Sequence, residues 1–73
     1  MPEYPVLKPK EVFITLNKAG FIKIRQKGSH AQFKKGNMLV TVPVHQRDLP
    51  LIVIKSIIRQ SGMTLEEFKE FLK

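Results

Sequence analysis

From Phe21 onward, the spacing of apolar residues changes from a helical period to a period of two, the spacing of a strand with one buried face. Two glycine-containing pairs interrupt the alternation, and we place the turns at Lys27-Gly28 and Gly36-Asn37. Glycine in the first position of a two-residue turn is typical of the type II′ turns that join antiparallel strands. Residues 21–44 therefore predict three antiparallel strands in chain order.

These turns set a register in which apolar residues oppose one another. The expected pairs are Ile24 with Ala31, Ile22 with Phe33, Phe33 with Val40, and Ala31 with Val42. Opposed residues share a face of a sheet, so one face would be apolar throughout, and a slip of one residue would destroy this agreement. The opposite face is expected to carry Lys23, Arg25, His30, Gln32, Lys34 and Thr41, with Arg25 and Pro43 beside His30.

Helical segments are expected on both sides of these strands. They run from Lys8-Pro9 to Gly20, from an N-cap at Asp48 to Gly62, and from Thr64 to Leu72. Proline falls in the first turn of the first two segments and glycine follows the last turn of each, as is common at helix ends. Thr64 and Glu67 have the spacing of a capping box, which marks the start of the short last helix.

A three-stranded sheet with one apolar face needs a cover, and the helices can supply it. We therefore expect an α+β fold of α-β-β-β-α order, in which the strands form an antiparallel meander with the helices on one face, followed by a short C-terminal helix. This is the layout of double-stranded-RNA-binding domains. The 73 residues make a single domain, residues 8–73, preceded by an N-terminal arm, residues 1–7, that contains two prolines.

The net charge of +7 is unevenly distributed along the chain. The segment from Val12 to Arg47 contains seven of the thirteen lysine and arginine residues and no acidic residue, while the other six basic residues balance the six acidic ones. Such a concentrated positive field attracts polyanions, of which nucleic acid is the commonest. A solvated basic face without a ligand is the alternative interpretation.

Other classes of function fit the composition less well. The chain has no cysteine and therefore neither a disulfide nor a thiolate metal site, which agrees with a cytoplasmic location. Two histidines without a cluster of carboxylates make a poor metal site, so we expect no metal and no other cofactor. The apolar run from Leu49 to Ile54 is far shorter than the roughly 20 residues that cross a membrane, so no membrane partner is expected.

Four short segments carry a resemblance to a known family. They are Gly20-Phe21, Gln26 to His30, Val40 to His45, and Ile58 to Thr64. With these motifs in this order, the chain from Lys8 to Phe71 resembles the HicA toxins, small RNA-cleaving proteins that pair with HicB antitoxins. The resemblance implies a ribosome-independent endoribonuclease that cuts mRNA, an mRNA interferase, with His30 as its catalytic residue. It also implies a HicB-type antitoxin as partner, which we expect to be acidic and to cover His30.

The chemistry can also be argued from the residues themselves. Without a metal, RNA is cleaved through its own 2′-hydroxyl, which requires a base to remove the proton and an acid to protonate the leaving 5′-oxygen. Histidine suits either role because it ordinarily titrates near neutral pH. Basic neighbours would neutralise the charge that grows on the phosphate in the transition state. The residues expected to bind RNA are Lys23, Arg25, Lys27, Ser29, Gln32 and Lys34.

Several residues near the histidine allow two interpretations. Ser29 either donates a hydrogen bond to phosphate or only completes the turn, whereas Gly28 serves the turn and allows a phosphate to approach closely. Strand periodicity puts His45 on the same face as His30. His45 is either the second acid–base group or a residue that fixes the end of its strand, and Lys27 is the other candidate for that group.

Two other classes of function stay open on the sequence alone. The same fold could bind structured RNA without cutting it, as a non-catalytic RNA-binding module. The chain could also be an interaction protein whose only target is another polypeptide, which would be acidic in order to match the basic face. Cleavage of RNA separates the nuclease from the first alternative, and salt-sensitive RNA binding by the isolated chain argues against the second.

Overall fold

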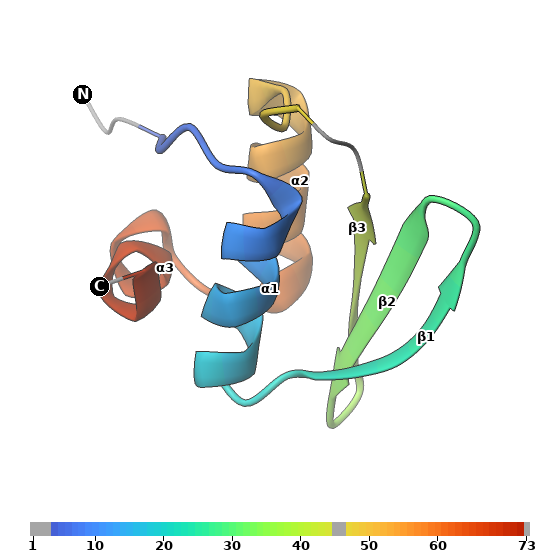
Figure 1. Cartoon of the computed structure of the whole chain (residues 1–73). Helices are drawn as coiled ribbons and strands as arrows, with labels where there is room; N and C mark the ends of the chain where they lie inside the picture. The colour runs from blue at the N-terminus through green and yellow to red at the C-terminus, as the bar shows by residue number, and fades with distance from the viewer. Residues whose placement is uncertain (1–3, 45–46, 73) are drawn as a thin grey trace.

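The elements occur in the expected order of one helix, three strands and two helices. The computed structural model describes residues 4–44 and 47–72. The elements are α1 (Pro9–Lys18), β1 (Ile22–Lys27), β2 (His30–Lys35), β3 (Met38–Pro43), α2 (Leu51–Ser61) and α3 (Leu65–Leu72). The strands form one antiparallel sheet of order β1-β2-β3, which confirms the α+β fold and the meander (Figure 1).

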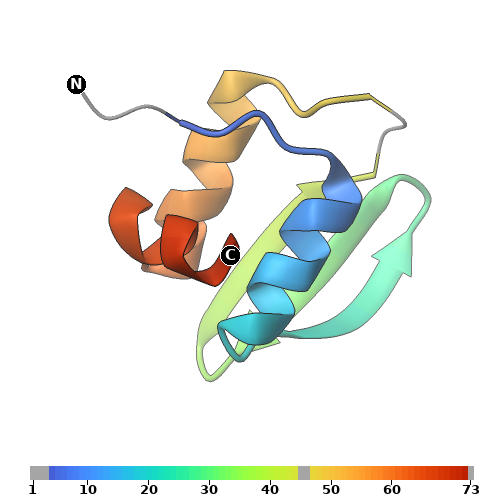
Figure 2. The ribbon, with the colours of Figure 1, turned by 60° about the vertical axis from the view of Figure 1, so that its left-hand side comes forward.

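The helices lie on one side of the sheet and leave the other side uncovered (Figures 1 and 2). α2 packs against β3, α1 contacts β1 and β3, and α3 packs against α1. The alternate residues of β2 and β3 that point towards the helices, Ala31, Phe33, Val40 and Val42, are at most 1% exposed. The helices meet them with Val12 and Leu16 from α1, Ile54, Ile57 and Ile58 from α2, and Phe68 from α3. The core therefore lies between the sheet and the helices, as the period of two predicts.

The hairpin of β2 and β3 has the register that the sequence predicts. Phe33 pairs with Val40, Ala31 with Val42, and His30 with Pro43. Gly36 has a positive φ of 58° at the first position of the turn, while Asn37 after it does not have a positive φ. This is the backbone of a type II′ turn, which only glycine adopts readily at its first position.

The first hairpin has a different register from the predicted one. Its turn is formed by Gly28 and Ser29 rather than by Lys27 and Gly28, because this places Gly28, with φ 59°, in the same first position as Gly36. The pairs next to the turn are Lys27 with His30, Gln26 with Ala31, and Arg25 with Gln32. The predicted pairs of Ile24 with Ala31 and of Ile22 with Phe33 are therefore wrong.

A β-bulge in β1 shifts the register of this hairpin once more. Ile24, between Lys23 and Arg25, is the unpaired residue and is 50% exposed. Beyond it the pairs are Lys23 with Phe33 and Ile22 with Lys34. A bulge changes which face the residues beyond it occupy, compared with an unbroken strand. Ile22 consequently lies on the uncovered side and is 68% exposed, although the sequence predicts it in the core.

The same bulge moves Lys23 to the side of the sheet that faces the helices. Its partner Phe33 is buried, and the Lys23 Nζ lies 5.7 Å from the centre of the Phe13 ring of α1. The Lys23 ammonium also donates a hydrogen bond to Oε1 of Gln26 at 2.6 Å, and Gln26 pairs with Ala31 on this same side. The predicted place of Lys23 on the face of His30 is therefore wrong.

We call the uncovered side of the sheet the open face. Paired residues form three rows across it: Lys27, His30 and Pro43; then Arg25, Gln32 and Thr41; then Ile22, Lys34 and Leu39. Successive rows are two residues apart along β2, which is roughly 6.6 Å in a strand. The open face thus runs from a row that contains His30 to a row with two aliphatic side chains.

α2 begins later than the sequence predicts. Its N-cap is Pro50 rather than Asp48, and the Pro50 carbonyl accepts hydrogen bonds from the N–H groups of Val53 and Ile54 at 3.0 and 3.1 Å. Leu49, between the two candidates, is buried, and its N–H donates to the Leu7 carbonyl at 2.7 Å. This contact holds the chain extended past Asp48, so the helix cannot start there.

The other helix ends follow the prediction. Gly62 follows α2 with φ 74°, the left-handed conformation that commonly ends a helix. Before α3, the Thr64 N–H donates to Oε1 of Glu67 at 2.8 Å and the Glu67 N–H donates to Oγ1 of Thr64 at 3.1 Å, which completes the capping box. Within residues 4–44 and 47–72, no helix has the length and the apolar character needed to cross a membrane.

Candidate nucleic-acid interface

His30 is the first residue of β2 and follows directly after the Gly28-Ser29 turn. Lys27 lies opposite it on β1 and Pro43 opposite it on β3, so His30 is the centre of the first row of the open face. The predicted neighbour Pro43 is confirmed. The other predicted neighbour, Arg25, is wrong because the shifted turn pairs Arg25 with Gln32, one row further along the sheet.

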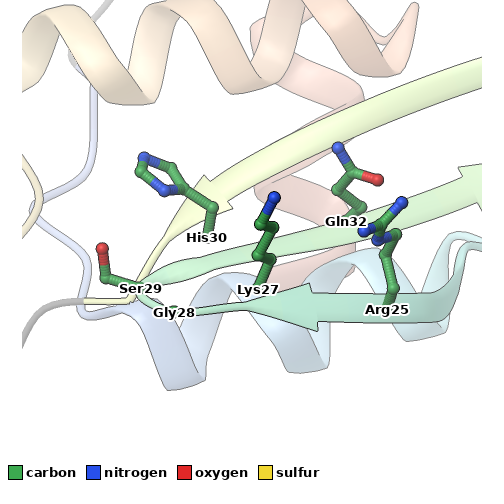
Figure 3. A pocket seen from close by; sticks show the side chains of 6 residues that line it. All are labelled: Arg25, Lys27, Gly28, Ser29, His30 and Gln32. Carbon is green, nitrogen blue, oxygen red and sulfur yellow. The ribbon is translucent and has the colours of Figure 1, made fainter.

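The residues around His30 border an open depression of about 500 Å³. It is lined by Arg25, Lys27, Gly28, Ser29, His30 and Gln32. Figure 3 shows the side chains of Arg25, Lys27, His30 and Gln32 rising on the same side of the hairpin. The depression therefore presents one imidazole, one ammonium, one guanidinium and one amide to whatever binds there.

The glycine turn shapes the floor of this depression. Gly28 has φ 59°, and a Cβ atom added to it would meet no heavy atom within 4 Å, so its backbone borders open space. The Gly28 carbonyl accepts a hydrogen bond from Nε2 of Gln26 at 3.3 Å, and the Ser29 carbonyl accepts one from the N–H of Val44. These two contacts tie both sides of the turn to the neighbouring strands, so His30 leaves it in a defined direction.

The electrostatic character of the depression is positive. None of its lining residues is acidic, and Arg25 and Lys27 both contribute a cation. The acidic residues that the structure describes belong to α1, to α3 and to the segment before α2, and none belongs to the sheet. A concave surface lined by charges of one sign concentrates ligands of the opposite sign, in this case anions such as phosphate groups.

Two of the residues predicted to bind RNA lie apart from this depression. Lys23 occupies the covered side of the sheet, and Lys34 lies in the third row of the open face, four residues from His30 along β2. Four residues of a strand span about 13 Å. The structure thus brings Arg25, Lys27, Ser29 and Gln32 together with His30, and it places Lys34 on the same face at a distance.

His45, the predicted second acid–base candidate, lies outside the described residues. Lys27, the other candidate, is the direct cross-strand partner of His30, and Cβ atoms of such partners are about 4.5–5.5 Å apart. The sequence predicts Lys27 near His30 but inside the turn, and therefore not as its cross-strand partner. The preference of a two-residue turn for glycine in its first position was the signal that could have corrected it.

A metal site is not evident in the part of the chain that the structure describes. No group of three or more histidine, cysteine, aspartate or glutamate side chains there could hold a metal ion. The donors that the depression does offer are amine, guanidinium, imidazole, hydroxyl and amide groups. Such a set suits the phosphate and sugar of a polynucleotide better than it suits a cation.

Comparison with known proteins gives one positive finding. The family model described as the HicA toxin of bacterial toxin–antitoxin systems matches residues 9–63, well over half of the chain. The matched region starts at α1 and ends just after α2, so it includes the whole sheet and every residue that lines the depression. A search of curated proteins found no match to this chain.

Proposed function

Because the chain belongs to the HicA family, the toxins of bacterial toxin–antitoxin systems, we propose that it is an endoribonuclease that cuts mRNA without a metal ion. In this proposal His30 transfers a proton during the cleavage step. The observation that carries it is the position of His30: an exposed histidine at the mouth of a glycine turn, opposite a lysine, in a positive depression. Since mRNA is the substrate, the proposed site of action is the cytoplasm.

The proposed reaction uses the 2′-hydroxyl of the RNA as its nucleophile. A base removes the hydroxyl proton, the 2′-oxygen forms a bond to phosphorus, and the bond from phosphorus to the 5′-oxygen breaks as an acid protonates that oxygen. The products are a 2′,3′-cyclic phosphate and a 5′-hydroxyl. His30 suits either proton transfer, because imidazole accepts and donates protons near neutral pH. Lys27 and His45 are the candidates for the other transfer.

The remaining lining residues have roles that follow from their charge and position. The Lys27 ammonium and the Arg25 guanidinium face the same depression as His30 and are placed to offset the negative charge that grows on phosphorus oxygens in the transition state. Gln32, in the next row, is placed to hydrogen-bond a sugar or base. The open space over Gly28 leaves room for a phosphate close to the backbone.

A toxin of this family has a cognate antitoxin as its partner. We propose that this antitoxin is of the HicB type, that it is acidic, and that it covers His30 and the basic residues around it. Two properties of the surface support this. The depression carries no acidic residue, so an acidic partner matches it in charge, and a protein lying over an open depression excludes the RNA directly.

Incubation of the purified chain with single-stranded mRNA in excess EDTA tests the proposed function. We expect the RNA to be cut into fragments at an unchanged rate when EDTA is added, because protein side chains supply the proton transfers and the positive charge in the proposed mechanism. RNA that stays intact while its mobility in a native gel shifts with salt concentration would instead identify a non-catalytic RNA-binding module. Cleavage that requires added magnesium would contradict the proposal.

A further inference from the structure

The end of the open face away from His30 is apolar. Ile22 on β1 and Leu39 on β3 flank Lys34 on β2, and they are 68% and 46% exposed. The Lys34 side chain between them is also exposed, and its four methylene groups add apolar surface to the same row. We call Ile22, Leu39 and the methylene groups of Lys34 the apolar strip.

The bulge in β1 is the reason that this strip exists. In an unbroken strand with the same turn, Ile24 would face Phe33 on the covered side and Lys23 would lie opposite Lys34 on the open face, as the alternation of the sequence favours. The bulge instead places Ile22 opposite Lys34 and turns Lys23 to the side of α1, where it stays exposed beside Phe13. The fold thus exposes an isoleucine on the open face at the place where the alternation favours a lysine. Bulges that re-aim side chains in this way, and apolar patches on an open surface, are characteristic of interaction sites.

We propose that the apolar strip anchors the antitoxin. The partner segment is a polypeptide that presents apolar side chains to Ile22 and Leu39. It presents acidic side chains to Lys34 within the strip, to Arg25 in the adjacent row and to Lys27 in the row beyond it. An apolar centre with a charged surround is the usual anatomy of a protein–protein interface. This inference rests on the proposed function in one respect, because the identity of the partner as an antitoxin comes from it.

The strip fits a protein segment better than it fits RNA or a second copy of the chain. Single-stranded bases bind by stacking on aromatic rings, and none of the residues that form the three rows of the open face is phenylalanine, tyrosine or tryptophan. A second copy carries the same net charge of +7, so two open faces would repel each other. An acidic segment with aliphatic side chains meets neither obstacle.

The partner is expected to lie across the open face rather than to extend the sheet beyond β3. The Thr41 N–H on the outer edge of β3 already donates to Oε1 of Gln60 at 2.9 Å, and Gln60 is held in turn by Ser56 through a hydrogen bond of 2.9 Å. Pro43, two residues on, has no N–H to offer. Two successive donor positions on this edge, Thr41 and Pro43, are therefore unavailable to an added strand.

Binding of the antitoxin and cleavage of RNA are consequently separable by mutation. His30 and the apolar strip occupy opposite ends of β2, about 13 Å apart along the strand. Neither Ile22 nor Leu39 lines the depression around His30. We therefore expect loss of the strip to free the toxin from its antitoxin while leaving its catalytic residues in place.

A double variant, Ile22→Ser with Leu39→Ser, tests this inference, and Leu51→Ser with Ile52→Ser is its matched control. The control removes two aliphatic side chains that are 55% and 76% exposed at the start of α2, away from the open face. The probe is the small protein encoded by the reading frame that adjoins this gene. We expect its Kd for the strip variant, measured by calorimetry with the full chain, to rise about 30-fold or more, as for the loss of an interface hot spot. The Kd of the control variant and the RNA cleavage rates of both variants should stay within about threefold of the wild-type values.

Two outcomes would overturn the inference, and two others have a defined consequence. An unchanged Kd for the strip variant, or an equal loss in the control, would place the antitoxin elsewhere. Weaker RNA cleavage with an unchanged Kd would make the strip part of the RNA site. If the double variant shows a lowered Tm or altered circular dichroism, the single variant Leu39→Ser decides by the same comparison, with Ile52→Ser as its control. A wild-type chain that does not cut RNA would refute the proposed nuclease, while the Kd comparison would still decide on the strip.

Discussion

Replacing His30 by alanine is expected to lower the rate of RNA cleavage by about 10²–10⁴-fold, the usual cost of losing a general acid–base group. His30 is exposed and borders the depression rather than the core, so the variant should keep its fold. Its affinity for RNA should change little, because lysine and arginine provide the attraction to phosphate. Cells that express the variant should therefore grow, whereas cells that express the wild-type chain should not.

The matched control for this variant is Asn37→Ala, which changes an exposed residue in the second position of the other turn of the sheet. Cleavage by the control should be close to wild type, and circular dichroism should be the same for all three proteins. A folded His30→Ala protein that cuts RNA at the wild-type rate would remove His30 from the mechanism.

Replacing Lys27 by alanine is expected to have the second largest effect, a loss of about 10²–10³-fold in kcat. This is typical when a group that stabilises transition-state charge is removed. Lys27 lies directly opposite His30 and lines the same depression, so its charge is close to the reacting phosphate. Lys27→Arg should keep the rate within about tenfold of wild type, because arginine supplies the same charge.

The arginine variant also separates the two possible roles of Lys27. Arginine does not give up its proton in proteins, so a Lys27→Arg protein as slow as Lys27→Ala would show that Lys27 transfers a proton. The neighbouring lysine of the same strand, Lys23, provides the control, because it lies on the covered side near Phe13. Lys23→Ala should affect cleavage by less than about threefold, and a loss as large as that of Lys27→Ala would contradict the site described here.

The sequence predicts the second hairpin and fails at the first for identifiable physical reasons. Across the Gly36-Asn37 turn, the apolar residues of both strands agree with the turn preference of glycine, so only one register satisfies both. Across the first turn the alternation does not decide, because turns at Lys27-Gly28 and at Gly28-Ser29 both keep Ile24 on the side of Phe33 in an unbroken strand. The preference of glycine for the first position favours Gly28-Ser29, which is the turn in the structure.

The bulge at Ile24 could not be predicted from the alternation of residues 22–27. A bulge adds one unpaired residue to the strand, and the alternation itself contains no signal of this. Its consequences are the placement of Lys23 on the covered side, beside Phe13 of α1, and the exposure of Ile22, and both placements differ from the prediction.

The candidate site was more predictable than the strand that borders it. His30 leaves the turn at the start of β2 in either register, and β2 alternates strictly, so His30, Gln32 and Lys34 had to share a face. Which residue of β1 lies opposite His30 depends on the position of the turn. The sequence predicts Arg25 there, whereas the structure has Lys27. The Lys27 ammonium is therefore the cation opposite His30, and the Arg25 guanidinium lies one row away.

Analysis of the ends of the cleaved RNA tests the central claim most directly. If the 2′-hydroxyl is the nucleophile and His30 transfers a proton, fragments made in EDTA carry a 2′,3′-cyclic phosphate or a 3′-phosphate, and a 5′-hydroxyl. In the proposed mechanism, His30 and the cations beside it in the depression act without a metal ion. Fragments with a 3′-hydroxyl and a 5′-phosphate would show that water attacks the phosphorus instead, and would contradict the account.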